Sequence, residues 1–439
     1  MNRSDNLQRR DFIKASAGAA AAASIAGWGK LAGADDAHHP ACHLTYATPA
    51  DAIKSPVETI AYLPCIRTST GVDKPDYLAT IDVDSSSSSF GSVIHRLEMP
   101  NVGDELHHFG WNACSSCHGM EGPGRRYLIL PGITSSRIHI IDTIDPKQPK
   151  LHKVIEGDEI KRVTGLSAPH TVHCLADGHI MISMLGMADG SAPGGFILLD
   201  DQFNIAGRWT DDTGPMKFNY DFWYQPRHNV MVSSEWGAPN TVSKGFNPDD
   251  VAAGKYGRQL HFWNWQDRKI EQTVDLGETG MIPLEVRFHH DPTSTHGFVG
   301  AALSSTMWHW HRDGTKWKAD KVIAVESVEQ DGWPFPVPGL ITDLVLSMDD
   351  RYLYFSNWLH GDLRQYDVSD PSNPKLTGQL WLGGVIGKTA SVKGKQLEGG
   401  PQMLQLSLDG KRLYVTSSLY SPWDEQFYPK MKETGSYML

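Results

Sequence analysis

Ten short apolar runs, each bounded by Gly, Pro, Asp or Asn, recur between Tyr77 and the carboxyl end of the chain. Runs of this length that end at turn residues are typical of β-strands, and long amphipathic helices are hard to find between them. The sequence therefore predicts an all-β protein. The ten runs are YLATIDVD, RIHIIDTID, HIMISMLG, GFILLD, NVMVSSEW, LHFWNW, GFVGAAL, YLYFSNW, LRQYDVSD and RLYVTSSLY.

Two internal matches show how these strands are organised. IHIIDTIDPKQPKL at 138–151 and LRQYDVSDPSNPKL at 363–376 share their Asp, Pro, Lys and Leu positions in register. SMDDRYLYFS at 347–356 and SLDGKRLYVT at 407–416 repeat one turn-then-strand arrangement. Repeated sheet units of this kind indicate a β-propeller, in which the innermost strands converge on a central axis. We expect seven blades. The alternative is unrelated β-turns that share Asp-Pro chemistry.

The amino terminus has the layout of a twin-arginine export signal. Arg9 and Arg10 precede an Ala-rich run from Ala15 to Ala26 and the small residues 32–34. We expect residues 1–34 to be the signal, 35–44 a flexible lead-in and 45–439 a single propeller domain. This signal predicts a periplasmic location, where disulfides and oxygen chemistry are permitted. A transmembrane anchor is the alternative, but the run is short and weakly apolar.

Charge and cysteine content narrow the possible partners. Removing residues 1–34 takes away five Lys or Arg and two Asp or Glu, so the net charge changes from -11 to -14. Such a surface does not favour nucleic acid, and no segment after the signal approaches the ~20 apolar residues of a membrane span, so we expect no stable membrane insertion. The chain has five cysteines, an odd number, so at least one does not pair with another cysteine of this chain.

Histidines recur beside strand-like runs and suggest one metal ringed by strands, near the propeller axis. Imidazole is a common ligand for zinc, copper, iron and nickel, and a ring of sheets can bring distant segments together. The alternative for any single histidine is an ordinary surface or core residue. Histidines that form this pattern are His107, His108, His170, His173, His228, His289, His290 and His360.

Strand geometry refines this prediction. Adjacent side chains of a strand point to opposite faces, so we expect only one of His107 and His108 to reach the axis. His170 and His173 reach one ion together only if Pro169 opens a turn or bulge. Nearby carboxylates could orient the imidazoles, and nearby tryptophans could line a small apolar pocket. Loop charges and blade packing are the alternative roles of these residues, which are Asp104, Glu105, Glu235, Glu285, Asp343, Trp111, Trp223, Trp236 and Trp358.

Cysteines offer two further hypotheses. Cys114-Ser-Ser-Cys117-His118 matches the haem-attachment pattern, but that attachment acts on unfolded exported chains, so we favour a structural disulfide over a redox-active dithiol. Cys65 is followed closely by Arg67, a cation that could lower the pKa of its thiol and make it nucleophilic. The alternative for Cys65 is a small buried apolar residue.

Together these segments resemble the selenium-binding protein family, from about Cys42 to Leu439. Strings of this length are far beyond chance. The resemblance rests on YLPCI, PDYLATIDVD, VIHRLEMPN, DELHHFGWNACSSC, PKLHKVIE, HTVHCL, YDFWYQPRHNVM, FNPDDV, IPLEVRF, GFVGAALSST, PGLITDLVLS, YFSNWLHGDLRQYDVSDP, GGPQMLQLSLDGKRLYVTSSLYS and QFYP.

The resemblance implies a β-propeller and, for bacterial members, copper-dependent oxidation of methanethiol with O2 and water to formaldehyde, hydrogen sulfide and hydrogen peroxide. The partners implied are methanethiol and O2, and a homo-oligomer is possible. The family's selenium-binding cysteine falls on Cys65, which could also be catalytic, and His289 falls on a leucine position, which favours His290. The alternative function is a non-catalytic selenium or metal carrier that uses Cys65. The metal-ligand candidates are His107, His108, His170, His173, His228, His290 and His360, of which a subset is expected to bind.

One departure from the family concerns the carboxyl end. Relatives continue past the strand that would follow Met438, with a His-Glu-Leu-Arg segment and a cysteine-containing tail, whereas this sequence ends at Leu439. We therefore expect either a carboxyl end that is truncated relative to the family or a last blade that closes differently.

Overall fold

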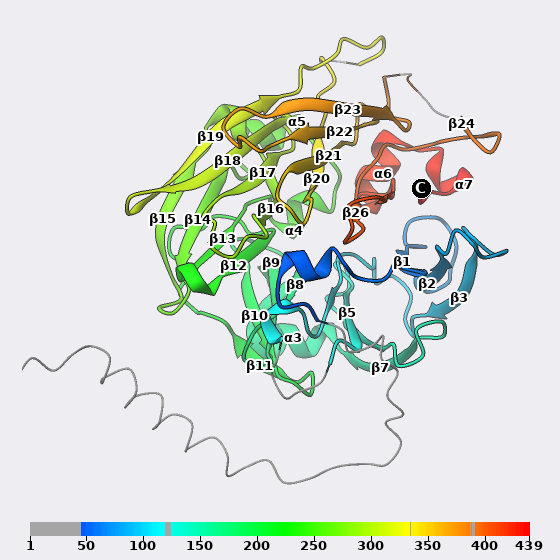
Figure 1. The fold of residues 1–439 in the computed structure, drawn as a ribbon, viewed down its shortest axis with the longest axis horizontal. Helices are drawn as coiled ribbons and strands as arrows, with labels where there is room; N and C mark the ends of the chain where they lie inside the picture. The colour runs from blue at the N-terminus through cyan, green and yellow to red at the C-terminus, as the bar shows by residue number, and fades with distance from the viewer. Residues whose placement is uncertain (1–44, 119–123, 334, 387, 389–390) are drawn as a thin grey trace, which may run out of the picture. The chain divides into compact units, whose positions relative to one another are not determined.

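The sheets of the protein follow one another around a ring in the computed structural model (Figure 1). The structure describes residues 45–118, 124–333, 335–386, 388 and 391–439. The predicted signal and lead-in therefore lie outside the described residues. Within the described part of the chain, the strands form sheets that are antiparallel throughout and in which each strand pairs with its neighbours in sequence.

Six of these sheets have three or four strands and form the blades of a β-propeller. The first blade contains β1 (Ile60–Cys65), β2 (Tyr77–Asp82) and β3 (Val93–Glu98). The second contains β4 (Gly110–Trp111), β5 (Tyr127–Pro131), β6 (Ile138–Asp142) and β7 (Lys150–Ile155). The third contains β8 (Leu166–Cys174), β9 (Ile180–Met187), β10 (Gly195–Leu199) and β11 (Ile205–Arg208).

The next three blades continue the ring. The fourth contains β12 (Phe222–Gln225), β13 (Val230–Ser233), β14 (Gln259–Asn264) and β15 (Lys269–Asp275). The fifth contains β16 (Pro283–Phe288), β17 (Gly297–Ala301), β18 (Thr306–Asp313) and β19 (Lys316–Ala324). The sixth contains β20 (Ile341–Leu346), β21 (Tyr352–Asn357), β22 (Asp362–Asp367) and β23 (Lys375–Trp381).

Two smaller strand pairs complete the sheets. They are β24 (Ser391–Val392) with β25 (Lys395–Gln396), and β26 (Leu404–Leu406) with β27 (Leu413–Val415).

The internal repeats fall where a propeller requires them. The 138–151 and 363–376 repeats cover the third strand and the start of the fourth strand in two blades, and the 347–356 and 407–416 repeats each cover a turn and the strand after it. The prediction of a β-propeller is therefore confirmed, with six blades among the described residues.

Burial decreases from the inner to the outer strand of a blade. The inner strand β8 and the next strand β9 are almost wholly buried, whereas nearly all residues of the outer strands β7, β15 and β23 are exposed or half-buried. Apolar side chains fill the space between successive sheets, and one such cluster joins the second and third blades through Ile129, Ile140, Ile182 and Ile197. Burial of this kind is the main contribution to stability in a sheet ring.

Buried carboxylates also tie neighbouring inner strands together at one end. Asp221 accepts a hydrogen bond from the backbone N–H of Val286 at 2.7 Å, and Asp343 accepts one from Leu404 N–H at 2.6 Å. Each bond links a residue of one blade to the inner strand of the next. The beginnings of the inner strands are thus held close to one another, and this end of the ring holds the candidate site.

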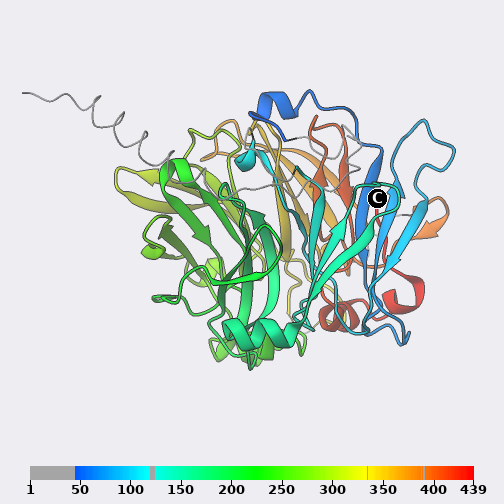
Figure 2. The same cartoon turned by 90° about the horizontal axis from the view of Figure 1, so that it is seen from below.

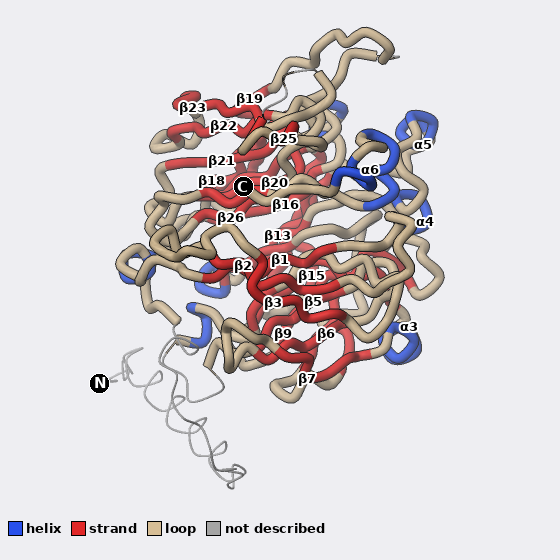
Figure 3. The backbone as a smooth tube through the Cα atoms, turned by 90° about the vertical axis from the view of Figure 1, so that its right-hand side faces the viewer, coloured by secondary structure: helices blue, strands red, loops and turns tan. Residues whose placement is uncertain are grey.

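Most of the described helices gather at the same end of the ring (Figures 2 and 3), whereas α2 (Pro49–Ala52) lies at the other end (Figure 2). Among them α6 packs Trp423 against a large apolar cluster that also contains Tyr220, Trp236 and Trp358. The described helices are α2 (Pro49–Ala52), α3 (Gly157–Thr164), α4 (Pro239–Val242), α5 (Pro248–Ala252), α6 (Ser421–Phe427) and α7 (Met431–Thr434), with short 3-10 turns η2 (Ser115–Cys117), η3 (Pro226–His228) and η4 (Glu278–Gly280). No described helix is long and apolar enough to cross a membrane.

Candidate metal centre

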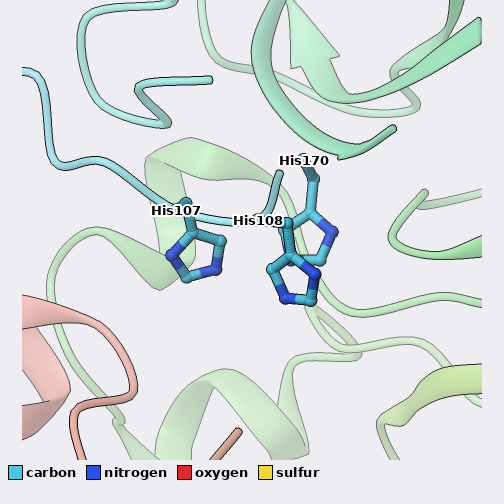
Figure 4. Close-up of side chains that lie close together, drawn as sticks. All are labelled: His107, His108 and His170. Carbon is cyan, nitrogen blue, oxygen red and sulfur yellow. The ribbon is translucent and has the colours of Figure 1, made fainter. Parts of the chain in front are cut away.

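Three of the predicted histidines meet where the second and third blades begin. His107, His108 and His170 each offer one ring nitrogen, and these nitrogens all lie within 4.8 Å of one another. Figure 4 shows the three rings grouped, with two on one chain segment and the third on another. His170 is fully buried, and His108 exposes 11% of its side chain. Three imidazoles at this spacing can hold one transition-metal ion.

The backbone explains why both adjacent histidines take part. We expected strand alternation to exclude either His107 or His108, and this expectation was wrong. Leu106 forms an isolated bridge with Gly132, but β4 begins only at Gly110, so the segment between them is not a regular strand. The two rings therefore escape the alternation and lie with their centroids 5.0 Å apart.

A β-bulge positions His170. The register between β8 and β9 shifts between Pro169 and Val172, and Ala168 has a positive φ of 56°. An irregularity at Pro169 was the condition for His170 and His173 to reach one ion together; it is present, but it does not bring His173 to the same point. The Nε2 atom of His173 lies 3.0 Å from the carbonyl oxygen of Phe222, outside the group of three.

A hydrogen-bonded chain fixes the tautomer of His170. The Thr171 hydroxyl donates to Asp221 at 2.7 Å, so it accepts from His170 Nδ1, which lies 2.9 Å away. The proton of His170 is therefore on Nδ1, and Nε2 keeps its lone pair. That Nε2 atom is buried without a hydrogen-bond partner. Metal-binding histidines commonly have such a partner on the second nitrogen, because it orients the ring and raises its basicity.

Three carboxylates and one guanidinium lie close to the histidines. Oε1 of Glu285 lies 3.4 Å from Nε2 of His108, while Oε2 lies 2.9 Å from Nη2 of Arg287. Arg287 also donates to Asp221 at 2.9 Å and lies 3.7 Å from Asp343. Burial raises the pKa of Asp221 to about 6 and that of Asp343 to about 7, although Arg287 opposes both shifts. Burial also raises the pKa of Glu285.

The imidazoles themselves are neutral at physiological pH. Burial lowers the pKa of His108 to about 4 and holds the pKa values of His107 and His170 well below the ordinary value. Neighbouring histidines add to the shift in His107 and His170. A metal ion would therefore find unprotonated ligands and would not have to displace a proton from them.

An apolar cavity adjoins His107. It contains about 370 Å³ of empty space, part of it open to solvent. Trp236 lines it as expected, whereas Trp111 and Trp223 lie elsewhere. Trp358 is not a lining residue, although it belongs to the same apolar cluster as Trp236. The residues that line the cavity are His107, Tyr220, Trp236, Ile282, Leu284, Ala302, Leu340, Thr342, Leu419, Tyr420 and Trp423.

The other predicted ligands lie apart from this group. His228 ends η3, in the connection between β12 and β13. His290 follows β16, and its Nδ1 lies 3.1 Å from Oδ1 of Asp350. His360 is buried, with Nε2 at 2.9 Å from the carbonyl oxygen of Val337. These contacts give His290 and His360 structural partners.

Cys65 ends β1 in the first blade and belongs to a different apolar cluster, together with Ala79 and Ile81. Burial raises the pKa of the Cys65 thiol, and this effect exceeds the opposing influence of the nearby arginines. Arg67 does act to lower this pKa, as expected, but burial outweighs it and the thiol is not activated. The guanidinium of Arg67 lies 3.0 Å from Glu98 and over the ring of Tyr77.

Cys114 is close to a cysteine that the sequence did not associate with it. Its Sγ atom lies 2.6 Å from Sγ of Cys174, the last residue of β8. The side chain of Cys117 lies outside the described residues, so the expected pairing of Cys114 with Cys117 stays a prediction. Cys42 also lies outside the described part of the chain.

Several residues around the histidines were not found from the sequence. Tyr220 packs against His170 with ring centroids 4.0 Å apart and a tilt of 44°, and Arg287 joins three carboxylates. Thr171 and Asp221 carry the hydrogen-bonded chain described above. Their position in the sequence could have indicated them. Thr171 and Arg287 lie within inner strands, and Tyr220 and Asp221 come directly before one.

The fold and the site define a β-propeller with a candidate metal site, made of one buried and two half-buried histidines beside an apolar cavity. Comparison with known proteins identifies its family. The model of the 56 kDa selenium binding protein family (SBP56) matches residues 40–439. The chain belongs to this family.

Individual relatives agree with this assignment. Proteins named methanethiol oxidase are 54% identical in Xenopus laevis and in Homo sapiens, over 91% of this chain and 89% of each relative. Selenium-binding protein 1 of Arabidopsis thaliana is 53% identical over 90% of this chain and 85% of its own length. A crystal structure of a hypothetical selenium-binding protein from Sulfolobus tokodaii is 44% identical, with a TM-score of 0.85 and 88% of each chain covered.

The amino terminus matches a second model. A twin-arginine translocation signal covers residues 6–26, so the protein carries an export signal and is directed to the periplasm. This match confirms the predicted location.

Proposed function

We propose that this protein is a methanethiol oxidase that uses one copper ion held by His107, His108 and His170. The reaction consumes methanethiol, O2 and water and yields formaldehyde, hydrogen sulfide and hydrogen peroxide. The observation that carries this proposal is the group of three neutral imidazoles at one wall of an apolar cavity. The identity of 54% to methanethiol oxidases supports it.

The donor set fits copper. Three imidazole nitrogens suit copper, which ranks highest among divalent first-row metals in affinity for such sites. The buried Nε2 atoms of His108 and His170 have no hydrogen-bond partner, and an unpaired buried polar atom is costly unless something binds it. When bound, copper supplies the capacity to bind a thiolate and to transfer electrons to O2.

The protein's own residues select and orient the substrate. The cavity beside His107 is lined by apolar and aromatic side chains, which accept a methyl group and disfavour charged thiols. Burial keeps the pKa of Tyr220 well above its ordinary value, so its hydroxyl stays protonated at the cavity wall. Glu285 faces His108, and Arg287 holds the second oxygen of that carboxylate in place.

The alternative is a selenium or metal carrier that uses Cys65. One observation favours it: Cys65 is the described cysteine that lies outside the group of Cys114 and Cys174. Against it, burial raises the pKa of the Cys65 thiol and so lowers the population of the reactive thiolate. A carrier would also have no use for the support that Thr171 and Asp221 give to His170.

We also propose a seventh blade and a mature amino terminus near residue 35. The pair β26 and β27 resembles the first two strands of a blade, because the 407–416 repeat matches 347–356. Leu439 adds hydrogen bonds to Val415 at 2.9 and 3.0 Å, as a third strand would. Cleavage after the small residues 32–34 would leave the propeller domain from 45 onward with a short lead-in.

Metal substitution tests the proposed function. Metal-depleted protein is divided and reloaded with copper or with zinc, and O2 uptake is recorded with and without methanethiol. We expect uptake that depends on methanethiol with copper, together with formaldehyde and sulfide, and none with zinc, which has the same ligands but no redox chemistry. No uptake with copper, together with stable selenite labelling of Cys65, would support the carrier instead.

A further inference from the structure

A second group of histidines lies in the fifth blade, away from the candidate metal centre. We call His289, His296, His309 and His311 the four-histidine cluster. His289 follows β16, His296 precedes β17, and His309 and His311 lie two residues apart on one face of β18. The pairing of Gly297 with Trp310 and of Phe298 with His309 places the His296 end of β17 beside His311.

The rings of this cluster form one continuous group. The centroids of His296 and His309 lie 5.0 Å apart with an interplanar angle of 3°. His311 lies 5.1 Å from His309 and 5.9 Å from His296, and His289 lies 5.6 Å from His296. Four imidazoles thus lie close together at the edge of a blade, and the rings of His296 and His309 meet edge to edge.

Three ring nitrogens in the cluster have no hydrogen bond to any described residue. His309 exposes only 1% of its surface, and its Nδ1 atom is buried and unpaired. Nε2 of His289 and Nδ1 of His311 are also buried without a hydrogen bond. Nearly all buried polar atoms in proteins find a partner, so three orphaned nitrogens in one cluster point to a bound ligand.

The spacing of one pair indicates what that ligand is. Nδ1 of His296 and Nε2 of His309 lie 2.8 Å apart. Two imidazole nitrogens that bind one metal ion at 2.0–2.1 Å are about 2.9 to 3.3 Å apart, depending on the angle at the metal. The pair is thus spaced almost as two ligands of one ion would be. A hydrogen bond between two neutral rings is the alternative.

We propose that the four-histidine cluster binds a divalent transition-metal ion such as zinc or copper, at a site separate from the candidate metal centre. His296 and His309 hold the ion, and His289 and His311 complete its shell by rotating their rings. Four nitrogen ligands suit both metals. His289, His296 and His311 are only partly buried, so an ion can reach the cluster from solvent.

The protonation state of the cluster favours this binding. Burial lowers the pKa of His309 to about 3, and it also lowers the pKa values of His289 and His296. These rings are unprotonated at neutral pH. Oδ2 of Asp320 lies 3.8 Å from Nδ1 of His311 and adds negative charge beside the cluster.

Metal stoichiometry tests this proposal without relying on enzyme activity. Full-length protein is stripped of metal and equilibrated by dialysis against zinc, and bound zinc is measured by elemental analysis. We expect the wild type to bind two equivalents of zinc and His296→Gln to bind one. In this variant the affinity of the four-histidine cluster for zinc should be at least about tenfold lower than in the wild type. His170→Ala should lose the equivalent bound at the candidate metal centre and keep the one at the four-histidine cluster. His152→Gln removes an exposed histidine of the second blade and should keep both.

Further variants guard against misfolding and against the alternative interpretation. His311→Gln alters a partly exposed position of β18, and circular dichroism checks that each variant is folded. Two equivalents in folded His296→Gln and His311→Gln, or a single equivalent in the wild type that only His170→Ala removes, would overturn the proposal. The second outcome would assign the contact between His296 and His309 to a hydrogen bond.

Discussion

The two histidine groups of this propeller differ in what surrounds them. His107, His108 and His170 lie beside an apolar cavity, and the Thr171 hydroxyl and Asp221 fix the orientation of one ring. The four-histidine cluster lies at the edge of the fifth blade, and its shortest polar contact joins two histidines. Oriented ligands beside an apolar cavity suit chemistry, whereas ligands at a blade edge suit binding alone. The number of histidines therefore says less about function than their surroundings do.

The largest expected effect is a loss of activity on removing a ligand from the central group, which consists of His107, His108 and His170. His170→Ala should lose its metal and at least about 100-fold of its methanethiol-dependent O2 uptake, since the loss of a ligand costs more than the 10–100-fold typical of its supporting residues. His296→Gln should retain uptake within about twofold. Uptake measured with metal content checks both variants, and equal losses would remove the distinction between the two groups.

His173→Ala is the matched control for the central group. His173 lies on the same strand as His170, but its Nε2 atom contacts the Phe222 carbonyl oxygen. This variant should therefore keep its metal. Loss of metal from folded His173→Ala would mean that the ligand set differs from the one proposed.

The support of His170 can be tested separately. Thr171→Val keeps the shape of the side chain but removes the hydroxyl that accepts the Nδ1 proton of His170. Copper affinity should fall about 10- to 100-fold, as measured by competition with a chelator. Thr164→Val is the control, because this buried hydroxyl donates to the Ile160 carbonyl oxygen and accepts from the Leu166 N–H, and neither partner is a histidine. If both variants bind copper as the wild type does, the hydrogen-bonded chain does not tune the site.

A smaller effect is expected from narrowing the cavity. Ala302 lines the cavity without touching the proposed ligands, and Ala302→Leu would fill part of the space beside them. Overpacking of this kind costs about 1–3 kcal/mol, so KM for methanethiol should rise about tenfold. Copper content should not change. An unchanged KM in folded, copper-loaded Ala302→Leu would place the substrate elsewhere.

The smallest effect concerns stability at the end of the ring that carries the central group. Burial raises the pKa of Asp424 to about 7, while Ser418 and two backbone N–H groups oppose the shift. The folded state then binds more protons than the unfolded state between about pH 4 and pH 7. The free energy of unfolding should therefore fall as pH rises through this range, by at most about 1.4 kcal/mol per pH unit.

Denaturant unfolding at pH 5 and pH 8 measures this contribution of Asp424. Asp424→Asn should remove it, so the variant should lose less stability than the wild type between the two pH values. Equal pH dependence in both proteins would show that Asp424 does not titrate in this range.

The sequence predicted the sheets better than the side-chain directions. The apolar runs and the Asp-Pro repeats located the strands correctly, because burial and turn chemistry are local properties. The pairing of His107 with His108 could not be predicted, since β4 is too short to impose strand alternation there. The proximity of Cys114 to Cys174 depends on two blades packing together, which no local pattern records. Thr171 and Asp221 were missed for the same reason.

X-ray absorption at the copper edge tests the central claim most directly. The sample is copper-loaded, active His296→Gln, in which the proposed peripheral site is disabled and only the central metal contributes. The account predicts a first shell that includes three imidazole nitrogens at about 2.0 Å, which is lost in the double variant with His170→Ala. A sulfur shell from a cysteine, or full activity without any transition metal, would contradict it.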